Sequence, residues 1–499
     1  MKKSDSAIVI HPEDSVCITT RSFTKGETVA FEDKIMTLQE DIPSGHKVAR
    51  RHLSAGEHVL KFGYSIGRAS SDIQEGQWVH THNLRTNLEG KLNYSYKPAK
   101  EEIKRQPSDL TFQGYIRSNG EAGIRNEIWI INTVGCINKT AEILARMGNE
   151  RFKDSAIDGI FHFAHPFGCS QLGDDLSNTQ KILSNLVHHP NAAGVLVLGL
   201  GCENNSVNQF MKVIDEFDQD RVKFLISQEV EDELETGMDL IKALVEYAES
   251  FKRQPVPISA LKIGMKCGGS DGFSGITANP LVGSFSDLLV SYGGTTIMTE
   301  VPEMFGAETI LMNRAQDEAV FNKTVALIND FKNYYISHNQ VVYENPSPGN
   351  KQGGITTLEE KSLGCVQKGG HAYVADVLPY GSRVVKNGLN LVQGPGNDLV
   401  SVTALAASGA HIVLFTTGRG TPFGGPVPTV KISTNSLLCQ KKSNWIDFNA
   451  GQLLEDVGFR ELTDDLFHYV LQVASGEIAT RNEQNGFKEI AIFKDGVTL

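Results

Sequence analysis

The amino-acid sequence predicts an α/β protein in which a small N-terminal all-β domain precedes two blocks built on parallel sheets. Short alternating segments separated by Gly, Pro and Asp fill the first part of the chain. Apolar strands that end in glycine and lead into helical segments follow, and this pattern resumes after a break near Pro255. At 499 residues the chain exceeds what a single hydrophobic core usually serves.

The β domain is expected over residues 1–98. Its segments alternate apolar and polar residues, which is typical of half-buried strands. They read AIVI, VCITT, ETVAF, IMTLQ, HKVAR, HVLKFG and QWVHTHN. A charged passage with two prolines, SYKPAKEEIKRQPSD, follows and predicts a linker at residues 99–112.

The first α/β block is expected over residues 113–255. Four strand and helix alternations predict a parallel sheet that is covered on both faces. The strands are NEIWIINTVGC, IDGIFHFAHPFGC, AAGVLVLGLGC and RVKFLIS, and each leads into a helical segment.

The second α/β block is expected over residues 256–499, with strands at ALKIGMKCGG, GTTIMTEVP, GLNLVQGPG, HIVLFTTGRG and TVKIST. Between them lies a Gly- and Pro-rich passage, YENPSPGNKQGGITTLEEKSLGCVQKGG. Long passages of this kind inside a compact domain are usually functional. Ligands bind at the carboxyl ends of parallel strands, so we expect VGC, HPFGC, GLGCENN, KCGGSDG, TEVPE and TTGRGTP to converge.

Composition and charge exclude several classes of function. The net charge of −12 and the pI near 5.7 argue against a nucleic-acid or membrane-surface partner. No stretch approaches ~18 apolar residues, and the charged N-terminus is unlike a signal peptide, so we expect a cytoplasmic protein with its seven cysteines as thiols. Neither a Walker loop nor the dinucleotide fingerprint is found, which argues against nucleotide or NAD chemistry.

His80 and His82 are candidate metal ligands. If WVHTHN is a strand, the two side chains point to the same face and both can reach one cation. A solvated pair on an exposed edge is the alternative. The cysteines lack the short spacing of most cluster motifs, so small buried residues are the simpler interpretation, although one thiolate on a catalytic metal stays open. Cys136 is the thiol that we include among the candidate ligands.

Two further motifs carry ionisable groups. GIRNEIW places Arg125 and Asn126 before a strand, where an arginine suits a carboxylate and an asparagine a hydroxyl; pairing of Arg125 with a nearby acid is the alternative. TTLEEKSLG sets Glu359 beside Glu360 and Lys361. A lysine in a desolvated crevice can have its pKa lowered enough to act as a base, whereas such a run is otherwise a solvated face.

Long motifs in one order make this sequence similar to the altronate/galactarate sugar-acid dehydratase family. They are RNEIWIINTVGC, GCSQLGDD, GLGCENN, CGGSDGFSGITANP, TEVPEMFGAE, YENPSPGNKQGGITTLEEKSLG and STNS after RGTPFGG. The N-terminal domain resembles the SAF domain of that family. The resemblance implies a hydro-lyase of hexuronate catabolism that converts D-altronate to 2-dehydro-3-deoxy-D-gluconate. It also implies a divalent metal, chiefly Fe²⁺ with Mn²⁺ as the alternative.

Loss of water from a sugar acid requires stabilisation of an enediolate and assistance to the leaving hydroxyl, which a metal and cationic donors supply. With the resemblance, Lys361 becomes the candidate general base, tuned by Glu359. His82 joins these catalytic candidates, and His80, His82 and Cys136 are the expected metal ligands. Arg125 or Arg419 would bind the substrate carboxylate. The expected hydroxyl contacts are Asn126, Ser270, Asp271, Ser274 and Thr421.

Two alternatives stay open on the sequence. One is a dehydratase of another sugar acid, such as galactarate, because the hydroxyl contacts that select an epimer are not identified by sequence. The other is a sugar-acid-binding protein without catalysis. A homo-oligomer is also left open.

Overall fold

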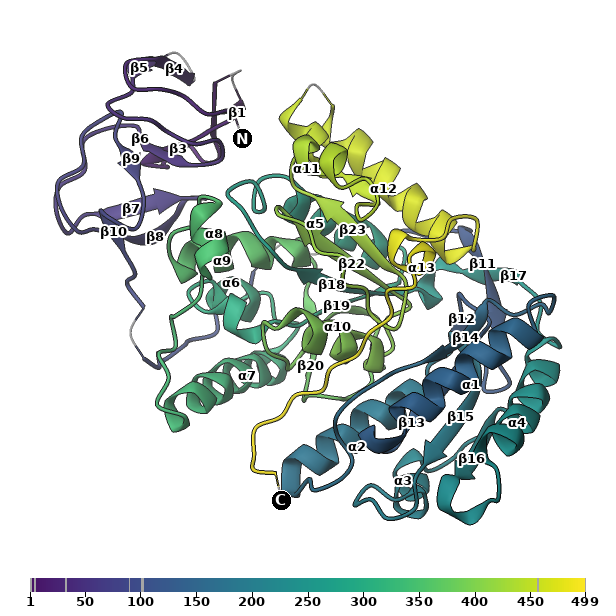
Figure 1. Cartoon of the computed structure of the whole chain (residues 1–499). Coiled ribbons are helices and arrows are strands. Elements are labelled where there is room, and N and C mark those ends of the chain that lie inside the picture. Colours follow the sequence, from purple (N-terminus) through teal and green to yellow (C-terminus); the bar gives the residue numbers. More distant parts are fainter. Residues whose placement is uncertain are drawn as a thin grey trace.

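The structure of the chain is a computed structural model that describes residues 2–3, 6–31, 34–88, 90–99, 103–455 and 457–498. Figure 1 shows a small β domain at the N-terminus and two α/β units, each built on a parallel sheet. The predicted fold class is therefore confirmed. No helix among the described residues is long and apolar enough to cross a membrane.

The N-terminal domain is made of short strands. Its sheets are five-stranded (β1-β2-β3-β6-β9), three-stranded (β10-β8-β7) and two-stranded (β4-β5). The strands are β1 Lys2–Lys3, β2 Ala7–Val9, β3 Val16–Thr19, β4 Thr28–Phe31, β5 Lys34–Thr37, β6 Lys47–Ala49, β7 His58–Lys61, β8 Tyr64–Ala69, β9 Trp78–Val79 and β10 Leu84–Arg85.

A long connection leads from this domain into the rest of the chain. Tyr94 donates a hydrogen bond to Glu308 and Tyr96 donates to the carbonyl oxygen of Ala315, so the connection lies against the second α/β unit. Strand β11 (Thr111–Ile116) begins inside the predicted linker. It pairs with β17 (Gln254–Pro257) and with β12 (Ala122–Gly123), so the sequence taken as a break near Pro255 is a short strand.

The first α/β unit has the four predicted strands. Their order is β14-β13-β15-β16 and every pairing is parallel. The strands are β13 Glu127–Asn132, β14 Gly159–His162, β15 Ala192–Gly199 and β16 Val222–Ile226; the helices are η1 Gly135–Ile137, α1 Asn138–Arg151, α2 Gly173–Val187, α3 Val207–Ile214 and α4 Glu233–Ala248, with η2 Ser227–Glu229 between β16 and α4.

The helices of this unit bury two different cores. Helices α1 and α4 cover one face through Leu144 and Ile241. Helix α2, on the other face, packs with α10 (Asp398–Ala407) of the second α/β unit through Ile182 and Leu405. One core therefore joins the two α/β units.

The second α/β unit is built on a seven-stranded parallel sheet of order β20-β21-β19-β18-β22-β23-β24. The strands are β18 Lys262–Cys267, β19 Thr295–Met298, β20 Val374–Leu378, β21 Gly388–Val392, β22 Ile412–Thr417, β23 Thr429–Ser433 and β24 Phe448–Asn449. Five of the seven were predicted. The edge strands β20 and β24 were not, and β24 has only two residues.

Helices pack around this sheet, and three of them lie in the Gly- and Pro-rich passage. They are η3 Ile258–Ala260, α5 Ala278–Ser291, η4 Val301–Met304, α6 Glu308–Met312, α7 Glu318–Ser337, α8 Pro348–Gln352, α9 Leu358–Cys365, η5 Val366–Gly369, α10 Asp398–Ala407, α11 Ser436–Lys441, η6 Ala450–Leu454, α12 Phe459–Ala474 and α13 Arg481–Gln484. The passage predicted to be structureless therefore contains α8, α9 and η5.

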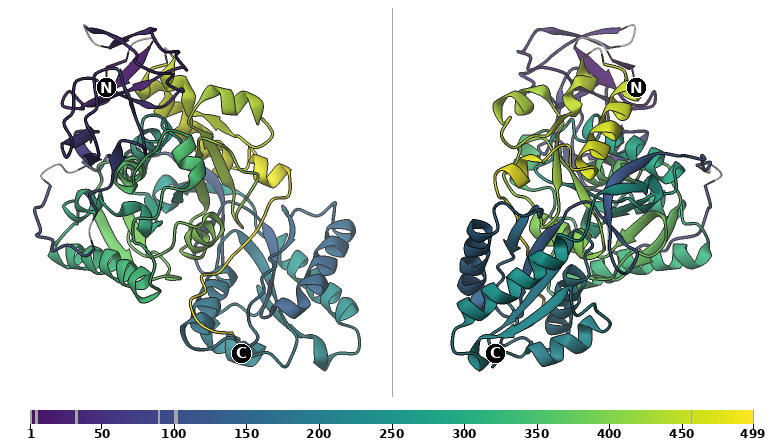
Figure 2. Two further views of the ribbon diagram at one scale, coloured as in Figure 1. Left: turned by 60° about the vertical axis from the view of Figure 1, so that its left-hand side comes forward. Right: turned by 90° about the vertical axis from the view of Figure 1, so that its right-hand side faces the viewer.

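The last residues of the chain return to the first α/β unit. Figure 2 shows this segment crossing from the C-terminal unit to the end of the chain beside the first sheet. Ile490 and Ile492 are buried in the core shared by the two units, and Gln171 forms a bridge with Thr498. The tail thus fastens the two α/β units together.

Candidate active site

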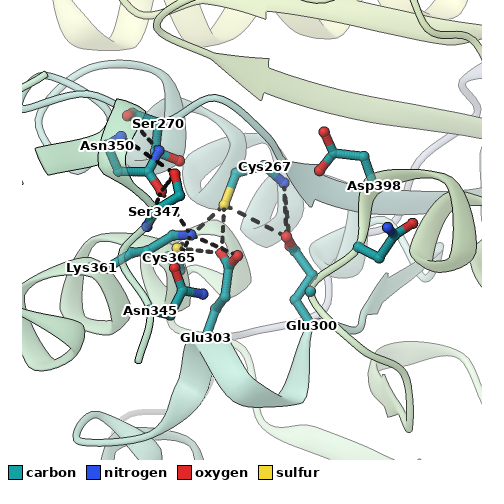
Figure 3. Close-up of polar contacts among 12 residues, drawn as sticks. Cys267, Ser270, Glu300, Glu303, Asn345, Ser347, Asn350, Lys361, Cys365 and Asp398 are labelled. Carbon is teal, nitrogen blue, oxygen red and sulfur yellow. Dashed lines mark hydrogen bonds and ion pairs between the residues drawn. The ribbon is translucent and has the colours of Figure 1, made fainter. Parts of the chain in front are cut away.

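Two cysteines and a glutamate meet at the carboxyl end of the central strands of the seven-stranded sheet. Cys267 is the last residue of β18, Glu303 lies in η4 just after β19, and Cys365 ends α9. All three side chains are buried, and Figure 3 shows them pointing toward one another. We call them the thiol–carboxylate cluster.

The distances within the cluster are short. The Sγ atoms of Cys267 and Cys365 are 3.2 Å apart, and Glu303 Oε2 lies 3.3 Å from the first and 3.1 Å from the second. Among the described residues, these are the three His, Cys, Asp or Glu side chains whose ligand atoms all lie within 4.8 Å of one another. The cluster could therefore hold a metal ion.

Buried lysines surround this cluster. Lys361 Nζ donates to Glu303 Oε1 at 2.8 Å, and Lys368 Nζ lies 3.0 Å from Cys267 Sγ and 3.1 Å from Glu300 Oε2. Lys266 also pairs with Glu300. Burial alone would raise the pKa of Glu303, but the three ammonium groups outweigh it and hold the pKa at about 2. Glu303 is therefore a carboxylate at neutral pH.

Lys361 has a different partner from the one predicted. Glu359 accepts hydrogen bonds from Thr86 and from the backbone N–H of Asn87, whereas Glu303 is the carboxylate on Lys361. Burial lowers the pKa of Lys361, but Glu303 and the two cysteines outweigh it, so the pKa is raised. The expected lowering was wrong, because the anionic groups next to Lys361 outweigh the effect of its burial.

Glu360 joins the N-terminal domain to this site. It accepts from Lys47 Nζ at 2.8 Å and from Lys61 Nζ at 2.8 Å, and the side chains of all three residues are almost fully buried. Burial raises the pKa of Glu360, yet the two lysines bring it to about 2. Burial lowers the pKa of Lys47 to about 8. The N-terminal domain is thus held against α9, one residue from Lys361.

The segment GGSDGFSG and Lys361 line the same small cavity. Asp271 accepts from Ser274 Oγ at 3.1 Å and from Thr434 Oγ1 at 2.9 Å, and burial raises its pKa. Ser270 is buried, and its carbonyl oxygen accepts from Asn350. The cavity enclosed by this segment, Lys61 and α9 has a volume of about 10 Å³, which suffices for a single water molecule.

A much larger pocket adjoins that cavity and shares Asp271 with it. Its volume is about 670 Å³, a size typical of small-molecule sites. Arg21 of the N-terminal domain and Arg419 after β22 contribute positive charge. Gly418 is required here because a Cβ would lie 2.2 Å from Asp271 Cγ. Thr421 lies beyond Arg419, where its carbonyl oxygen accepts from Lys431.

The two histidines do not share a strand. Strand β9 ends at Val79, and residues 80–83 form a turn in which the backbone N–H of Asn83 donates to the carbonyl oxygen of His80. His80 Nε2 lies 2.8 Å from the Lys351 carbonyl oxygen, and both histidine rings contact Trp78 in tilted arrangements. Burial lowers the pKa of His80. The predicted strand was wrong because the Asn83 side chain closes a turn on the backbone N–H of His80.

Three other predicted residues lie on the first α/β unit. Arg125 forms a buried ion pair with Glu483, 2.7 Å from Nε to Oε1, which is the alternative anticipated from the sequence. Asn126 accepts from Arg117 and donates to the carbonyl oxygens of Ala156 and Ala248. Cys136 is exposed at the edge of the four-stranded sheet. The thiol–carboxylate cluster contains none of these residues.

The six strand ends that were expected to converge are divided between two sheets. KCGGSDG, TEVPE and TTGRGTP follow strands of the seven-stranded sheet, whereas VGC, HPFGC and GLGCENN follow strands of the four-stranded sheet. Four residues of this site were not predicted from the sequence: Cys267, Glu303, Cys365 and Lys368. Their signal was present in TEVPE and SLGC, but the separation of these motifs along the chain hid their contact.

Comparisons with known proteins cover nearly the whole chain. The family model described as Altronate/galactarate dehydratase SAF domain matches residues 5–87. The model for D-galactarate dehydratase/Altronate hydrolase, second domain, matches 114–249, and that for D-galactarate/Altronate dehydratase, C-terminal, matches 258–498.

Individual relatives agree with these models. The chain is 53% identical to the altronate dehydratase of Bacillus subtilis (strain 168) over 99% of this chain and 100% of the relative. It is 50% identical to the altronate dehydratase of Escherichia coli (strain K12) over 99% of each chain. It is 32% identical to the galactarate dehydratase (L-threo-forming) of Escherichia coli (strain K12) over 97% of this chain and 96% of the relative.

Proposed function

This chain belongs to the altronate/galactarate dehydratase family, and we propose that it removes water from D-altronate to give 2-dehydro-3-deoxy-D-gluconate, a step of hexuronate catabolism. Identity of 50% and 53% to two altronate dehydratases, against 32% to a galactarate dehydratase, favours the aldonate over the aldarate. The observation that carries the proposal is the set of buried cations around Glu303 and Lys361, beside a pocket large enough for a six-carbon acid.

The thiol–carboxylate cluster fits a ferrous ion. Thiolates are soft ligands that favour iron or zinc, whereas manganese prefers oxygen donors, so Cys267 and Cys365 favour Fe²⁺ over Mn²⁺. When bound, such an ion supplies Lewis acidity to oxygen atoms of the substrate. Lys361 and Lys368 already contact the donor atoms, and their positive charges would offset the anionic ligands.

Lys361 carries a proton at neutral pH because its pKa is raised. We therefore assign it the stabilisation of the enediolate, in place of the base role expected from the sequence. A fixed ammonium group in a water-poor site stabilises developing negative charge far better than one in bulk water. Asn345 and Asn350 also accept from Lys361 Nζ, at 3.1 and 3.3 Å, and so fix its direction.

The substrate enters through the 670 Å³ pocket. Arg419 is exposed on its wall and donates to Gln352 Oε1 at 3.1 Å, which leaves the guanidinium group available for a carboxylate. Asp271 lines both this pocket and the cavity at Lys361, and Ser274 lines the cavity, so they are the proposed hydroxyl contacts.

The test is an anaerobic assay of keto-acid release with ferrous iron and a panel of aldonates and aldarates. We expect D-altronate to give the highest kcat/KM. Preference for galactarate would assign the chain to the other activity of the family. Thermal stabilisation by several sugar acids without any keto acid formed would indicate a binding protein and refute the proposal.

A further inference from the structure

Three exposed cysteines lie at one edge of the four-stranded sheet, away from the thiol–carboxylate cluster in the sequence and in a different sheet. They are Cys136, Cys169 and Cys202. Each follows a glycine in the loop after a strand: Cys136 after β13, Cys169 after β14 and Cys202 after β15. Because β14, β13 and β15 are adjacent and parallel, their carboxyl ends meet at the same edge.

The three loops are bonded to one another. The backbone N–H of Gly135 donates to Phe167 O at 2.9 Å, which links the loop of Cys136 to that of Cys169. The backbone N–H of Asn205 donates to Gly168 O at 2.9 Å, and that of Ser170 donates to Asn204 Oδ1 at 2.8 Å. These two bonds join the loops of Cys169 and Cys202.

Further contacts fix this arrangement. Asn205 Nδ2 donates to Thr133 O at 3.1 Å, and Thr133 Oγ1 donates to Glu203 Oε1 at 2.6 Å. Gly168 has φ +99°, and a Cβ there would lie 1.9 Å from Thr133 O, so the approach of the loops requires glycine. The backbone around the three thiols is therefore a closely packed, preformed frame.

The surroundings favour an anionic ligand set. Helices α1, α2 and α3 begin just after Cys136, Cys169 and Cys202, so the positive ends of their dipoles face this edge. None of the three helices has a side-chain hydrogen bond at its N-cap. Thiolates at this edge would thus lie near backbone N–H groups that lack a capping side chain.

The geometry distinguishes a single ion from a cluster. Three thiolates on one tetrahedral ion lie about 4 Å apart, since each metal–sulfur bond is about 2.3 Å. In the described part of the chain, the three sulfur atoms of these cysteines do not form a group within 4.8 Å of one another. In a [4Fe–4S] cluster each thiolate binds a different iron, so the thiolates lie further apart.

We propose that Cys136, Cys169 and Cys202 bind an iron–sulfur cluster of the [4Fe–4S] type, with three irons held by thiolates and the fourth free of a protein thiolate. The combination that supports this is one exposed thiol on each of three interlocked loops at the rim of one parallel sheet. The cluster site is additional to the proposed function and does not depend on which sugar acid is the substrate.

The experiment uses the full-length protein, purified anaerobically and incubated with ferrous iron, sulfide and a thiol reductant. After desalting, iron and acid-labile sulfide are measured per chain, together with visible absorption and electron paramagnetic resonance of the dithionite-reduced sample. We expect about four sulfides per chain, as in a [4Fe–4S] cluster. A protein that holds iron without labile sulfide would overturn the proposal.

Variants locate the site. Cys136→Ser, Cys169→Ser and Cys202→Ser, each measured separately, should lower labile sulfide at least about fivefold, because a cluster lacking one of three thiolates is lost on desalting. Cys439→Ser, at a partly exposed thiol on α11, is the matched control and should retain the cluster. Retention of sulfide in the three variants, or its loss in Cys267→Ala/Cys365→Ala instead, would place the cluster elsewhere and refute the assignment.

This result is separable from that of the proposed function. The exposed positions of the three thiols make serine substitutions compatible with folding, which circular dichroism and thermal unfolding check. Labile sulfide is measured without turnover. A protein with a cluster but no keto-acid release would therefore refute the dehydratase proposal alone, and the reverse result would refute the cluster alone.

Discussion

Lys361 and Glu303 form a buried ion pair, 2.8 Å from Nζ to Oε1, between a helix of the Gly- and Pro-rich passage and the turn after β19. The two residues are 58 positions apart in the chain. The two charges stabilise each other in a region from which water is largely excluded. The pKa of Lys361 is therefore raised, and the pKa of Glu303 is held at about 2. A fixed cation next to a candidate metal site is the arrangement that dehydration of a sugar acid requires.

Replacement of Lys361 tests its role in turnover. Lys361→Met should lower kcat by about 10²–10³, the usual loss when one stabilising donor of a developing charge is removed. Iron content and the circular dichroism spectrum should stay unchanged. Lys323→Met, which removes a half-exposed lysine on α7, is the control and should keep full activity. Activity of Lys361→Met within a few-fold of the unmodified chain would exclude the role.

The metal ligands are tested by elemental analysis after anaerobic loading with ferrous iron in the absence of sulfide. Cys267→Ala/Cys365→Ala should lose the bound ion, because two of three donors are removed. His80→Ala/His82→Ala should retain it if the thiol–carboxylate cluster holds the metal. The sequence-based assignment predicts the opposite pattern, so the pair of variants decides between the two ligand sets.

Substitution of Arg419 tests how the substrate carboxylate is bound. Arg419→Gln should raise KM by about 10- to 100-fold, because a hydrogen bond to a charged group contributes about 1.5–3 kcal/mol. The kcat should change little, since the guanidinium is exposed in the outer pocket and does not contact the thiol–carboxylate cluster. The matched variant Arg460→Gln, in α12, should leave KM unaltered. An unchanged KM for Arg419→Gln would remove this residue from the binding site.

The pairing of Glu360 with Lys47 and Lys61 is predicted to stabilise the folded protein. Glu360→Gln leaves two buried ammonium groups without this carboxylate and should cost about 3–5 kcal/mol in the free energy of unfolding. Replacing all three residues by apolar ones, as in Lys47→Met/Lys61→Met/Glu360→Leu, should recover much of the loss. Urea denaturation measures both. A fully stable Glu360→Gln variant would contradict the prediction.

Stability should fall in acid between pH 4.5 and 2. The pKa values of Glu303 and Glu360 are lowered from 4.5 to about 2 by their lysine partners, so the unfolded chain binds more protons than the folded one in this interval. The stabilisation is complete above pH 4.5 and is lost as the pH falls through 2. Urea midpoints measured at several pH values check this. Glu246→Gln, at the exposed ion pair with Lys242, should leave the pH dependence as it is.

Much of the fold could be predicted from the sequence. Buried parallel strands such as EIWIIN and IVLFTT are largely apolar runs, and the glycines at their ends mark the loops. The positions of these strands along the chain could therefore be predicted. Edge strand β24 was missed because two residues carry no pattern. The strand predicted through His80 and His82 is ended by a hydrogen bond from the backbone N–H of His80 to the side-chain oxygen of Asn83, which propensity does not reveal.

Local patterns determined the fold class, the family and the segments that carry chemistry, because periodicity, turn residues and motifs are properties of neighbouring positions. Only the tertiary structure decided which charges meet. It placed Glu303 rather than Glu359 on Lys361, gave Glu360 two lysines from the N-terminal domain, and removed Arg125 to an ion pair with Glu483. Such pairings depend on how separate strands and helices pack, and the electrostatic energy of a buried charge depends on the groups within a few ångströms of it.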